Sequence, residues 1–268
     1  MLATAIVAAR AAGAVLRDGF GTSFVREEKG RPTDLVTEFD RRAETVLVEN
    51  ILARHPDHSI VGEEGGARQP GSDWEWILDP LDGTTSFAHG IPFFSVCVAL
   101  RHAGTVVVGV IYEPLRDELF SAERGGGAHL NGRRIHVSET SELSRALLAT
   151  GFPYAIAENP HRTLEVFSAV APRARGIRRL GSAGLDLAYL ACGRFDGYWE
   201  HSLKPWDCAA GALLVTEAGG RVGTWGTSGS PETWTPESLE TLATNGRVHE
   251  ELRSRILEGF GSVTPSAG

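Results

Sequence analysis

The segment that most constrains this chain spans residues 74–87, an apolar run followed at once by two aspartates three positions apart. Residues 74–78 are apolar and β-prone, so they favour a strand. Pro80 fixes φ and has no N–H, which predicts that the strand ends at Asp79. Because Asp79 and Asp82 then lie on a strand-to-turn corner, their carboxylates can converge on one point.

The second half of this segment predicts a turn that leads into a short helix. Asp82-Gly83 is a turn pair, and the hydroxyl residues at 84–86 are N-cap residues by type. The backbone N–H groups of residues 83–85 would face the same point as the carboxylates, where a helix start favours an anion. An acidic surface turn is the alternative interpretation, since Asp-Gly and Asp-Pro are common turn pairs.

Length and composition narrow the class of protein. The 268 residues fit one large domain or two lobes that share a core. With 42% hydrophobic and 22% charged residues, the chain has the composition of a soluble globular protein. A net charge of −8 predicts no nucleic-acid surface, and the basic run at 173–179 is expected to be a solvated loop and strand edge.

Cysteines, histidines and the N-terminus point to an intracellular protein. Three widely spaced cysteines predict reduced thiols, and the default location is the cytoplasm. The nine histidines show no zinc-ligand spacing. Arg10 and Arg17 interrupt the Ala-rich N-terminus, so we expect neither a signal peptide nor a membrane span.

Periodicity along the chain predicts two sheets layered with helices, a mixed α/β fold. The middle is an antiparallel meander with hairpin signals at Ala103-Gly104 and Asn131-Gly132. Loops are expected at 25–33, a mobile segment and lid, and at 223–238, and a frayed tail is expected after Phe260. Helices are predicted at 2–20, 37–54, 160–171, 182–192, 205–218 and 248–257, and strands at 59–61, 93–102, 105–112, 118–122, 146–150, 177–180, 197–200 and near Val222 and Leu242. Thr37 is the expected cap of the second helix, and Asp40 three residues on gives a capping-box pattern.

Two further acids are candidates to join the central pair. Glu63 lies in a loop with glycines on both sides. This indicates that the backbone geometry of the loop orients a carboxylate, although a solvated loop would have the same composition. Asp207 follows Pro205 at the start of a predicted helix, where an acid also complements the helix dipole without any ligand.

If Glu63, Asp79, Asp82 and Asp207 meet in one cleft, they repel one another and require cations. Ligands that are all oxygen select Mg²⁺ or Mn²⁺ over Zn²⁺, and the Leu81 carbonyl is available beside them. Two such ions roughly 3.5–4 Å apart suit an in-line displacement at phosphorus. The sequence therefore predicts hydrolysis of a phosphate monoester.

These motifs together resemble the signature set of the inositol monophosphatase family. The resemblance is carried by Gly62-Glu63-Glu64, by residues 79–87 and by residues 206–211, in the family's order, and covers nearly the whole chain. It implies a layered αβαβα fold and a single catalytic domain over 1–265, with lobes at about 1–140 and 141–265. It also implies a Mg²⁺-dependent, Li⁺-sensitive phosphomonoesterase that forms a homodimer.

The resemblance assigns roles residue by residue. Glu63, Asp79 and the Leu81 carbonyl match the ligands of a first metal, and Asp79, Asp82 and Asp207 those of a second. Glu63 also matches a ligand of a weaker third ion. Further matches are the dyad Thr84 and Asp40, which orients or deprotonates the attacking water, the lid residue Lys29, and the substrate-binding residues Asp82, Gly83, Thr84, Thr85, Gly181, Ser182, Ala183, Glu200 and Asp207.

Specificity is expected in the second half of the chain. Glu200 matches the acid that binds ring hydroxyls in inositol phosphatases, and a carboxylate suits a polyol better than a second phosphate. The sequence thus favours inositol 1-phosphate as substrate, without nucleic-acid or membrane partners. Alternatives on the same fold are a histidinol-phosphate, fructose-1,6-bisphosphate or broad sugar or nucleotide phosphatase, and a regulatory protein without catalysis.

Overall fold

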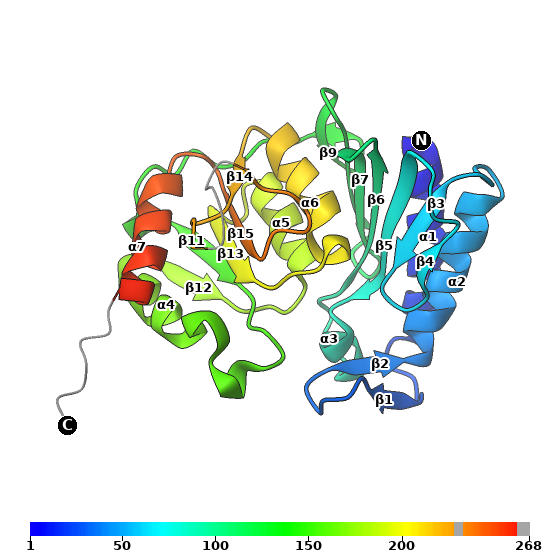
Figure 1. Ribbon diagram of the computed structural model, residues 1–268, viewed down its shortest axis with the longest axis horizontal. Coiled ribbons are helices and arrows are strands. Elements are labelled where there is room, and N and C mark those ends of the chain that lie inside the picture. Colours follow the sequence, from blue (N-terminus) through cyan, green and yellow to red (C-terminus); the bar gives the residue numbers. More distant parts are fainter. Residues whose placement is uncertain (228–232, 262–268) are drawn as a thin grey trace.

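Helices and two sheets stack in five alternating layers (Figure 1). The computed structural model describes residues 1–227 and 233–261. The layers are, in order, helices α1 and α2, an eight-stranded sheet, helices α5 and α6, a five-stranded sheet, and helices α4 and α7. This arrangement confirms the αβαβα fold that the sequence predicts.

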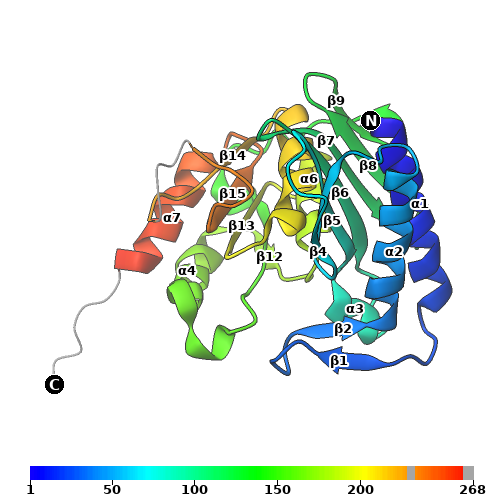
Figure 2. The ribbon, with the colours of Figure 1, turned by 45° about the vertical axis from the view of Figure 1, so that its right-hand side comes forward.

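Helices α1 (Leu2–Gly19) and α2 (Glu38–Leu52) cover the outer face of the larger sheet (Figure 2). The N-cap of α2 is Thr37, whose Oγ1 accepts from the Phe39 N–H at 3.1 Å. Asp40 Oδ2 in turn accepts from the Thr37 N–H at 2.7 Å. The predicted capping box is therefore confirmed, and it fixes the Asp40 carboxylate at the start of α2.

The larger sheet is the predicted meander. Its neighbouring strands are antiparallel except for the parallel pair β3 and β5. Asn131 and Gly132, with φ of 50° and 75°, form the expected hairpin turn. The order of strands across the sheet is β10 (Arg133–Arg134), β9 (Gly127–Leu130), β8 (Glu118–Glu123), β7 (Thr105–Glu113), β6 (Ser95–His102), β5 (Trp74–Asp82), β3 (Ser59–Gly62) and β4 (Gly66–Arg68).

Two predictions about the central segment are wrong. Strand β5 does not end at Asp79 but continues through Pro80 to Asp82, because the β5–β6 register shifts between those two aspartates and the ladder is already irregular at the proline. Helix α3 (Thr84–Ala88) has Gly83 as its N-cap, with no side-chain cap. The hydroxyl residues 84–86 therefore belong to the helix itself.

The prediction of a mobile loop at 25–33 is also partly wrong. Residues Arg26–Glu28 form strand β1, which pairs with β2 (Leu35–Thr37) as an antiparallel hairpin beside α3 (Figure 2). The charged side chains of β1 are exposed, so no apolar pattern marks this strand in the sequence.

The second sheet is formed by the second half of the chain, in which strands and helices alternate. Strand β11 is parallel to β12 and β13, and β15 is antiparallel to β13 and β14. The order is β12 (Gly176–Arg178), β11 (Leu147–Thr150), β13 (Gly197–His201), β15 (Glu240–Thr244) and β14 (Arg221–Gly223). The basic run therefore lies at the edge of this sheet, as predicted.

Four helices flank the smaller sheet. Helices α5 (Ala183–Ala191) and α6 (Pro205–Glu217) fill the space between the sheets, and α4 (Thr163–Val170) and α7 (His249–Gly261) cover the far face. Helix α4 is shorter than predicted because positive φ values at His161 and Arg162 keep the preceding 3₁₀ turn out of it. Other 3₁₀ turns are Leu143–Arg145, Ile156–Glu158 and Ala171–Arg173.

Some predictions fall partly outside the described residues. The irregular segment 223–238 includes residues 228–232, and the tail after Phe260 includes residues 262–268, and both stretches lie outside. The three cysteines are free, in agreement with the expectation of thiols. No helix in residues 1–227 and 233–261 has both the length and the apolar character needed to cross a membrane.

Candidate active site

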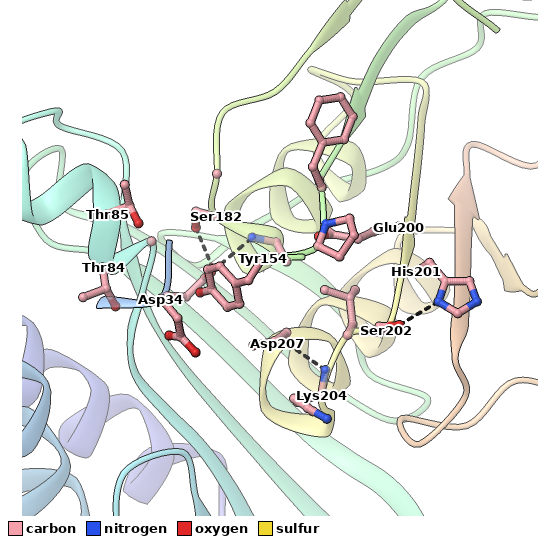
Figure 3. A pocket seen from close by; sticks show the side chains of 18 of the residues that line it. Asp34, Thr84, Thr85, Tyr154, Ser182, Glu200, His201, Ser202, Lys204 and Asp207 are labelled. Atoms are coloured by element: carbon pink, nitrogen blue, oxygen red, sulfur yellow. Dashed lines mark hydrogen bonds between the residues drawn. The ribbon is translucent and has the colours of Figure 1, made fainter. Parts of the chain in front are cut away.

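A cavity of about 670 Å³ lies where the two halves of the chain face each other (Figure 3). Thr84 and Thr85 lie on one side of it, and Glu200 and Asp207 on the other. Its volume suits a small-molecule site. The predicted residues that line the cavity are Lys29, Asp82, Gly83, Thr84, Thr85, Gly181, Ser182, Ala183, Glu200 and Asp207.

The other predicted residues do not line the cavity but lie behind its wall, in contact with residues that do. Asp40 accepts a hydrogen bond from Thr84, and Glu63 accepts one from Lys29. The Leu81 carbonyl accepts from Thr84 Oγ1 at 2.9 Å. Asp79 is 1% exposed and interacts electrostatically with three other acids.

Two of the four predicted acids, Asp82 and Asp207, line the cavity, and all four interact electrostatically. Burial raises the pKa of Asp79 well above its usual range, and the charges of Glu63, Asp82 and Asp207 raise it further. Burial likewise raises the pKa of Asp207, and again Glu63 and Asp82 add to the shift. Because charges influence one another over several ångströms, these effects place the four carboxylates in one region of the structure.

Asp82 is held in place by donors from the other half of the chain. Its carboxylate accepts from Ser182 Oγ at 2.5 Å, from the Gly184 N–H at 2.8 Å and from the Ala183 N–H at 3.1 Å. Ser95 Oγ donates at 3.2 Å. These hydrogen bonds lower the pKa of Asp82, but burial is the larger effect and the pKa remains raised.

Asp207 is the third residue of α6, which begins at Pro205 as predicted. Its Oδ2 accepts from the Lys204 N–H at 2.7 Å, a capping hydrogen bond that Figure 3 shows as a dashed line. Both interpretations of this acid thus hold together: it caps the helix, and it lies beside the other acids.

Lys29 forms an ion pair with one acid of the cluster, Glu63. Its Nζ donates to Glu63 Oε1 at 2.9 Å and also pairs with Glu64. Burial lowers the pKa of Lys29, but the two glutamates outweigh it and the pKa is raised. Burial raises the pKa of Glu63 to about 7, although Lys29 opposes this.

Glu44 supports the loop that carries Glu63. It is 3% exposed, and its Oε2 accepts from the Glu64 N–H at 2.9 Å. A Cβ at Gly62 or Gly65 would lie 2.5 Å or 2.3 Å from the Glu44 carboxylate, so both positions need glycine for space. The glycines around Glu63 thus do shape the loop, through a buried acid that the sequence analysis did not single out.

Thr84 forms the predicted pair with Asp40. Its hydroxyl donates toward Asp40 Oδ1 at 3.0 Å and toward the Leu81 carbonyl. Asp40 Oδ2 accepts from both the N–H and the hydroxyl of Thr37, so the carboxylate is fixed. Because the Thr84 proton is shared between acceptors, the lone pairs of its oxygen are available to a water in the cavity.

Gly83 brings the two halves of the chain together at the cavity. It has φ of 97°, and a Cβ there would lie 3.0 Å from the Phe93 carbonyl and 3.2 Å from the Gly181 carbonyl. The position therefore needs glycine for both conformation and space.

The opposite end of the cavity contains a second acidic wall. Glu200 accepts from the Tyr198 hydroxyl, and its carboxylate lies against Gly151, where a Cβ would be only 1.9 Å away. Burial raises the pKa of Glu200 to about 7, although Tyr198 and Arg179 lower it. Glu200 therefore lies in the cavity as predicted and does not end the strand on the surface.

The carboxylates repel one another, and carboxylate oxygens are the type of ligand that a hard divalent cation prefers. Within the part of the chain that the structure describes, however, no three or more His, Cys, Asp and Glu groups are arranged to hold a metal ion. Asp82 and Asp207 use oxygens as acceptors for N–H groups, and Lys29 pairs with Glu63. The donor set therefore fits a cation, whereas the predicted ligand geometry is not formed in this arrangement.

Sequence reasoning missed several residues that line the cavity, among them Asp34, Tyr154, Arg179 and Asp186. Arg179 ends the run expected to be wholly solvated. Asp186 follows the predicted segment 181–183 closely, and a single acid in an otherwise apolar helix was a signal that could have found it.

Comparison with known proteins gives a consistent result. The Inositol monophosphatase family matches this chain over residues 1–260. An inositol-1-monophosphatase of Synechocystis sp. is 45% identical over 95% of this chain and 88% of its own length. A protein named Nus factor SuhB from Pseudomonas aeruginosa is 46% identical over 83% of this chain and 84% of its own.

A solved structure supports the same assignment. The inositol monophosphatase of Anabaena (Nostoc) sp. matches with a TM-score of 0.84 and 42% identity, over 96% of this chain and 95% of the other. The resemblance seen in the motifs is therefore confirmed over the whole fold. The chain belongs to the inositol monophosphatase family, and it is a phosphoric monoester hydrolase.

Proposed function

We propose that this phosphatase hydrolyses the phosphate monoester of a small polyol, with inositol 1-phosphate as its substrate. The observation that carries the proposal is a cavity that Asp82, Asp207 and Glu200 line, with Glu63 and Asp79 interacting electrostatically with the first two from behind its wall. The four interacting acids suit the phosphate group with its cations, and Glu200 suits hydroxyl groups.

Mg²⁺ is the proposed cofactor, in two to three ions per site, with Mn²⁺ as a substitute. Glu63, Asp79, the Leu81 carbonyl, Asp82 and Asp207 would hold these ions. When bound, they would neutralise the repelling acids, lower the pKa of a water and stabilise the leaving oxygen. Lys29 would then release Glu63, because an ammonium and a divalent ion compete for the same carboxylate.

The chain's own residues supply orientation. Thr84, fixed by Asp40, would accept a hydrogen bond from the attacking water and so align it with the phosphorus. The backbone of residues 83–85 would bind the phosphate oxygens. Glu200 and residues 181–183 would bind the polyol, and the lid residue Lys29 would cover the site.

Removal of divalent ions tests the first half of this proposal. Wild-type protein with Mg²⁺ should release phosphate from inositol 1-phosphate, and EDTA should abolish this release until Mg²⁺ is restored. Mn²⁺ should restore part of the activity, and Li⁺ should inhibit it. Full activity in EDTA would refute the metal assignment.

A substrate panel tests the second half. We expect kcat/KM for inositol 1-phosphate to exceed that for histidinol phosphate, fructose 1,6-bisphosphate and nucleotide monophosphates. A higher value for a bisphosphate or a nucleotide would assign the protein to one of the alternative phosphatases on this fold.

The name of the Pseudomonas aeruginosa relative supports a second candidate function, that of a Nus factor. A strain that lacks this gene separates the two roles. If its growth defect is rescued by the wild type but not by Asp82→Asn, phosphatase activity is the required function. Rescue by both would assign the phenotype to the regulatory role.

The remaining features of the proposal concern the whole molecule. The catalytic unit would be residues 1–265, because both lobes contribute to the cavity. We propose a homodimer in the cytoplasm, without nucleic-acid or membrane partners. Light scattering of the purified protein would measure the oligomeric state.

A further inference from the structure

Asp186 is a buried carboxyl group that the proposed reaction does not yet use. It lies in the first turn of α5, is 1% exposed and lines the cavity. Its Oδ1 is buried without a hydrogen-bond partner in the part of the chain that the structure describes. A buried polar atom in this state requires an explanation, because it costs free energy unless something binds it.

Other buried acids of this chain have donors. Glu113 accepts from the N–H groups of Leu115 and Arg116, and both oxygens of Asp196 accept hydrogen bonds. Glu240 accepts from the N–H groups of Gly226 and Thr227. These acids hold a turn or join two segments of the chain, whereas no such hydrogen bond to Asp186 Oδ1 is found among the described residues.

The surroundings of Asp186 define what it can bind. Burial raises its pKa well above the usual range, and the charges of Glu200 and Asp82 add to the shift, whereas Arg179 lowers it. Glu200 lines the same cavity. Two carboxyl groups on one wall repel a second phosphate or carboxylate of a substrate, but both can hydrogen-bond neutral hydroxyl groups.

We propose that Asp186 is a specificity-determining residue, whose carboxyl group binds a ring hydroxyl of the substrate beside the hydroxyl bound by Glu200. The inference rests on the proposed polyol-phosphatase function and extends it. Ser182 caps α5 and also holds Asp82, so the same helix start aligns the phosphate end of the cavity with Asp186.

Two substrates that differ only in hydroxyl groups test the proposal. Inositol 1-phosphate and cyclohexyl phosphate have the same six-membered ring, but only the first can hydrogen-bond Asp186. In Asp186→Leu, the ratio of their kcat/KM values should fall about tenfold or more. The ratio should fall because the KM for inositol 1-phosphate rises. A hydrogen bond between Asp186 and a ring hydroxyl is made in the ground state and in the transition state alike.

A matched control comes from Glu113, an acid that is fully buried outside the cavity. Glu113→Gln should leave the ratio of the two substrates unchanged, since it removes a buried charge but no cavity contact. If Asp186→Leu does not fold, Asp186→Ala removes the same carboxyl group without added bulk, and the same criterion applies.

The outcomes separate this inference from the proposed function. No hydrolysis of inositol 1-phosphate by the wild type would overturn the proposed substrate and, with it, the role of Asp186. Wild-type hydrolysis with an unchanged ratio in the Asp186 variant would overturn only the inference. Equal losses on both substrates would also overturn it, because they would indicate a structural role.

Discussion

The two ends of the cavity are both acidic, but they are built differently. At the phosphate end, Asp82 accepts hydrogen bonds from Ser95, Ser182, Ala183 and Gly184. At the polyol end, Glu200 has one donor among the residues that the structure describes, Tyr198. Many donors fix the orientation of a carboxylate, whereas few donors leave acceptor capacity for a substrate.

The difference also concerns charge. At the phosphate end several carboxylates raise one another's pKa, so the cluster needs positive charge to ionise together. At the polyol end the pKa of Glu200, about 7, allows a carboxyl group that changes its charge near neutral pH. Substitutions at the two ends should therefore differ in their effects on reaction rate, substrate preference and the pH dependence of stability.

Asp82→Asn should have the largest effect. Loss of one negative charge from the cluster should lower kcat by at least about 10³-fold, or roughly 4 kcal/mol, on every phosphate ester. Phosphate release measures this effect. The melting temperature in EDTA should change little, because the substitution removes repulsion but also leaves the N–H of Ala183 or Gly184 facing an amide nitrogen. A large fall would mean that Asp82 also serves the fold.

Glu200→Gln should change the pH dependence of stability. Burial raises the folded-state pKa of Glu200 from 4.5 to about 7, so its contribution to stability is fully present below pH 4.5 and is lost as pH rises through 7. Glutamine does not titrate. The variant should therefore gain up to about 3 kcal/mol of unfolding free energy relative to wild type between about pH 4.5 and 8.

Urea unfolding in EDTA at about pH 4.5 and at about pH 8 measures this gain. Without divalent ions, the acid cluster is free of metal in both the variant and the wild type. A constant difference between variant and wild type across that range would contradict the assignment of a raised pKa to Glu200.

Thr84→Ala should have the next largest effect. Loss of the hydroxyl that aligns the attacking water should lower kcat about 10²-fold with little change in KM. Thr84→Ser keeps the hydroxyl and should recover most of the rate. Steady-state kinetics on inositol 1-phosphate measure both, and an equally inactive serine variant would show that the methyl group matters instead.

Gly151→Ala should have the smallest effect and should act only at the polyol end. The new Cβ would collide with the Glu200 carboxylate and displace it. We expect a loss of about tenfold in kcat/KM on inositol 1-phosphate and less on cyclohexyl phosphate. A uniform loss on both esters would show that the substitution disturbs the phosphate end as well.

Features set by a few neighbouring residues could be predicted from the sequence. The Thr37 cap and the Asn131-Gly132 hairpin are two examples. Local signals failed at Pro80, where the missing N–H falls at an irregularity of the strand ladder that local patterns do not reveal. They also failed at residues 84–86, because Gly83 takes the N-cap.

The candidate site was predictable to the extent that its residues lie in short motifs. The acids at 79 and 82 and the segment 181–183 lie in such motifs. In the structure, the Ala183 N–H donates a hydrogen bond to Asp82. Asp186 and Glu44 were missed because their burial depends on which elements pack around them, which follows from tertiary structure alone. Arg179 is exposed, and its place at the cavity likewise follows from tertiary structure alone.

The crowding around Gly83 has a consequence for directed evolution. Any larger residue there would push the Phe93 and Gly181 backbones apart and thus open the seam between the two halves of the molecule. A library randomised at codon 83 and selected for function should return almost only glycine, while the neighbouring codon 85 should return a wider set.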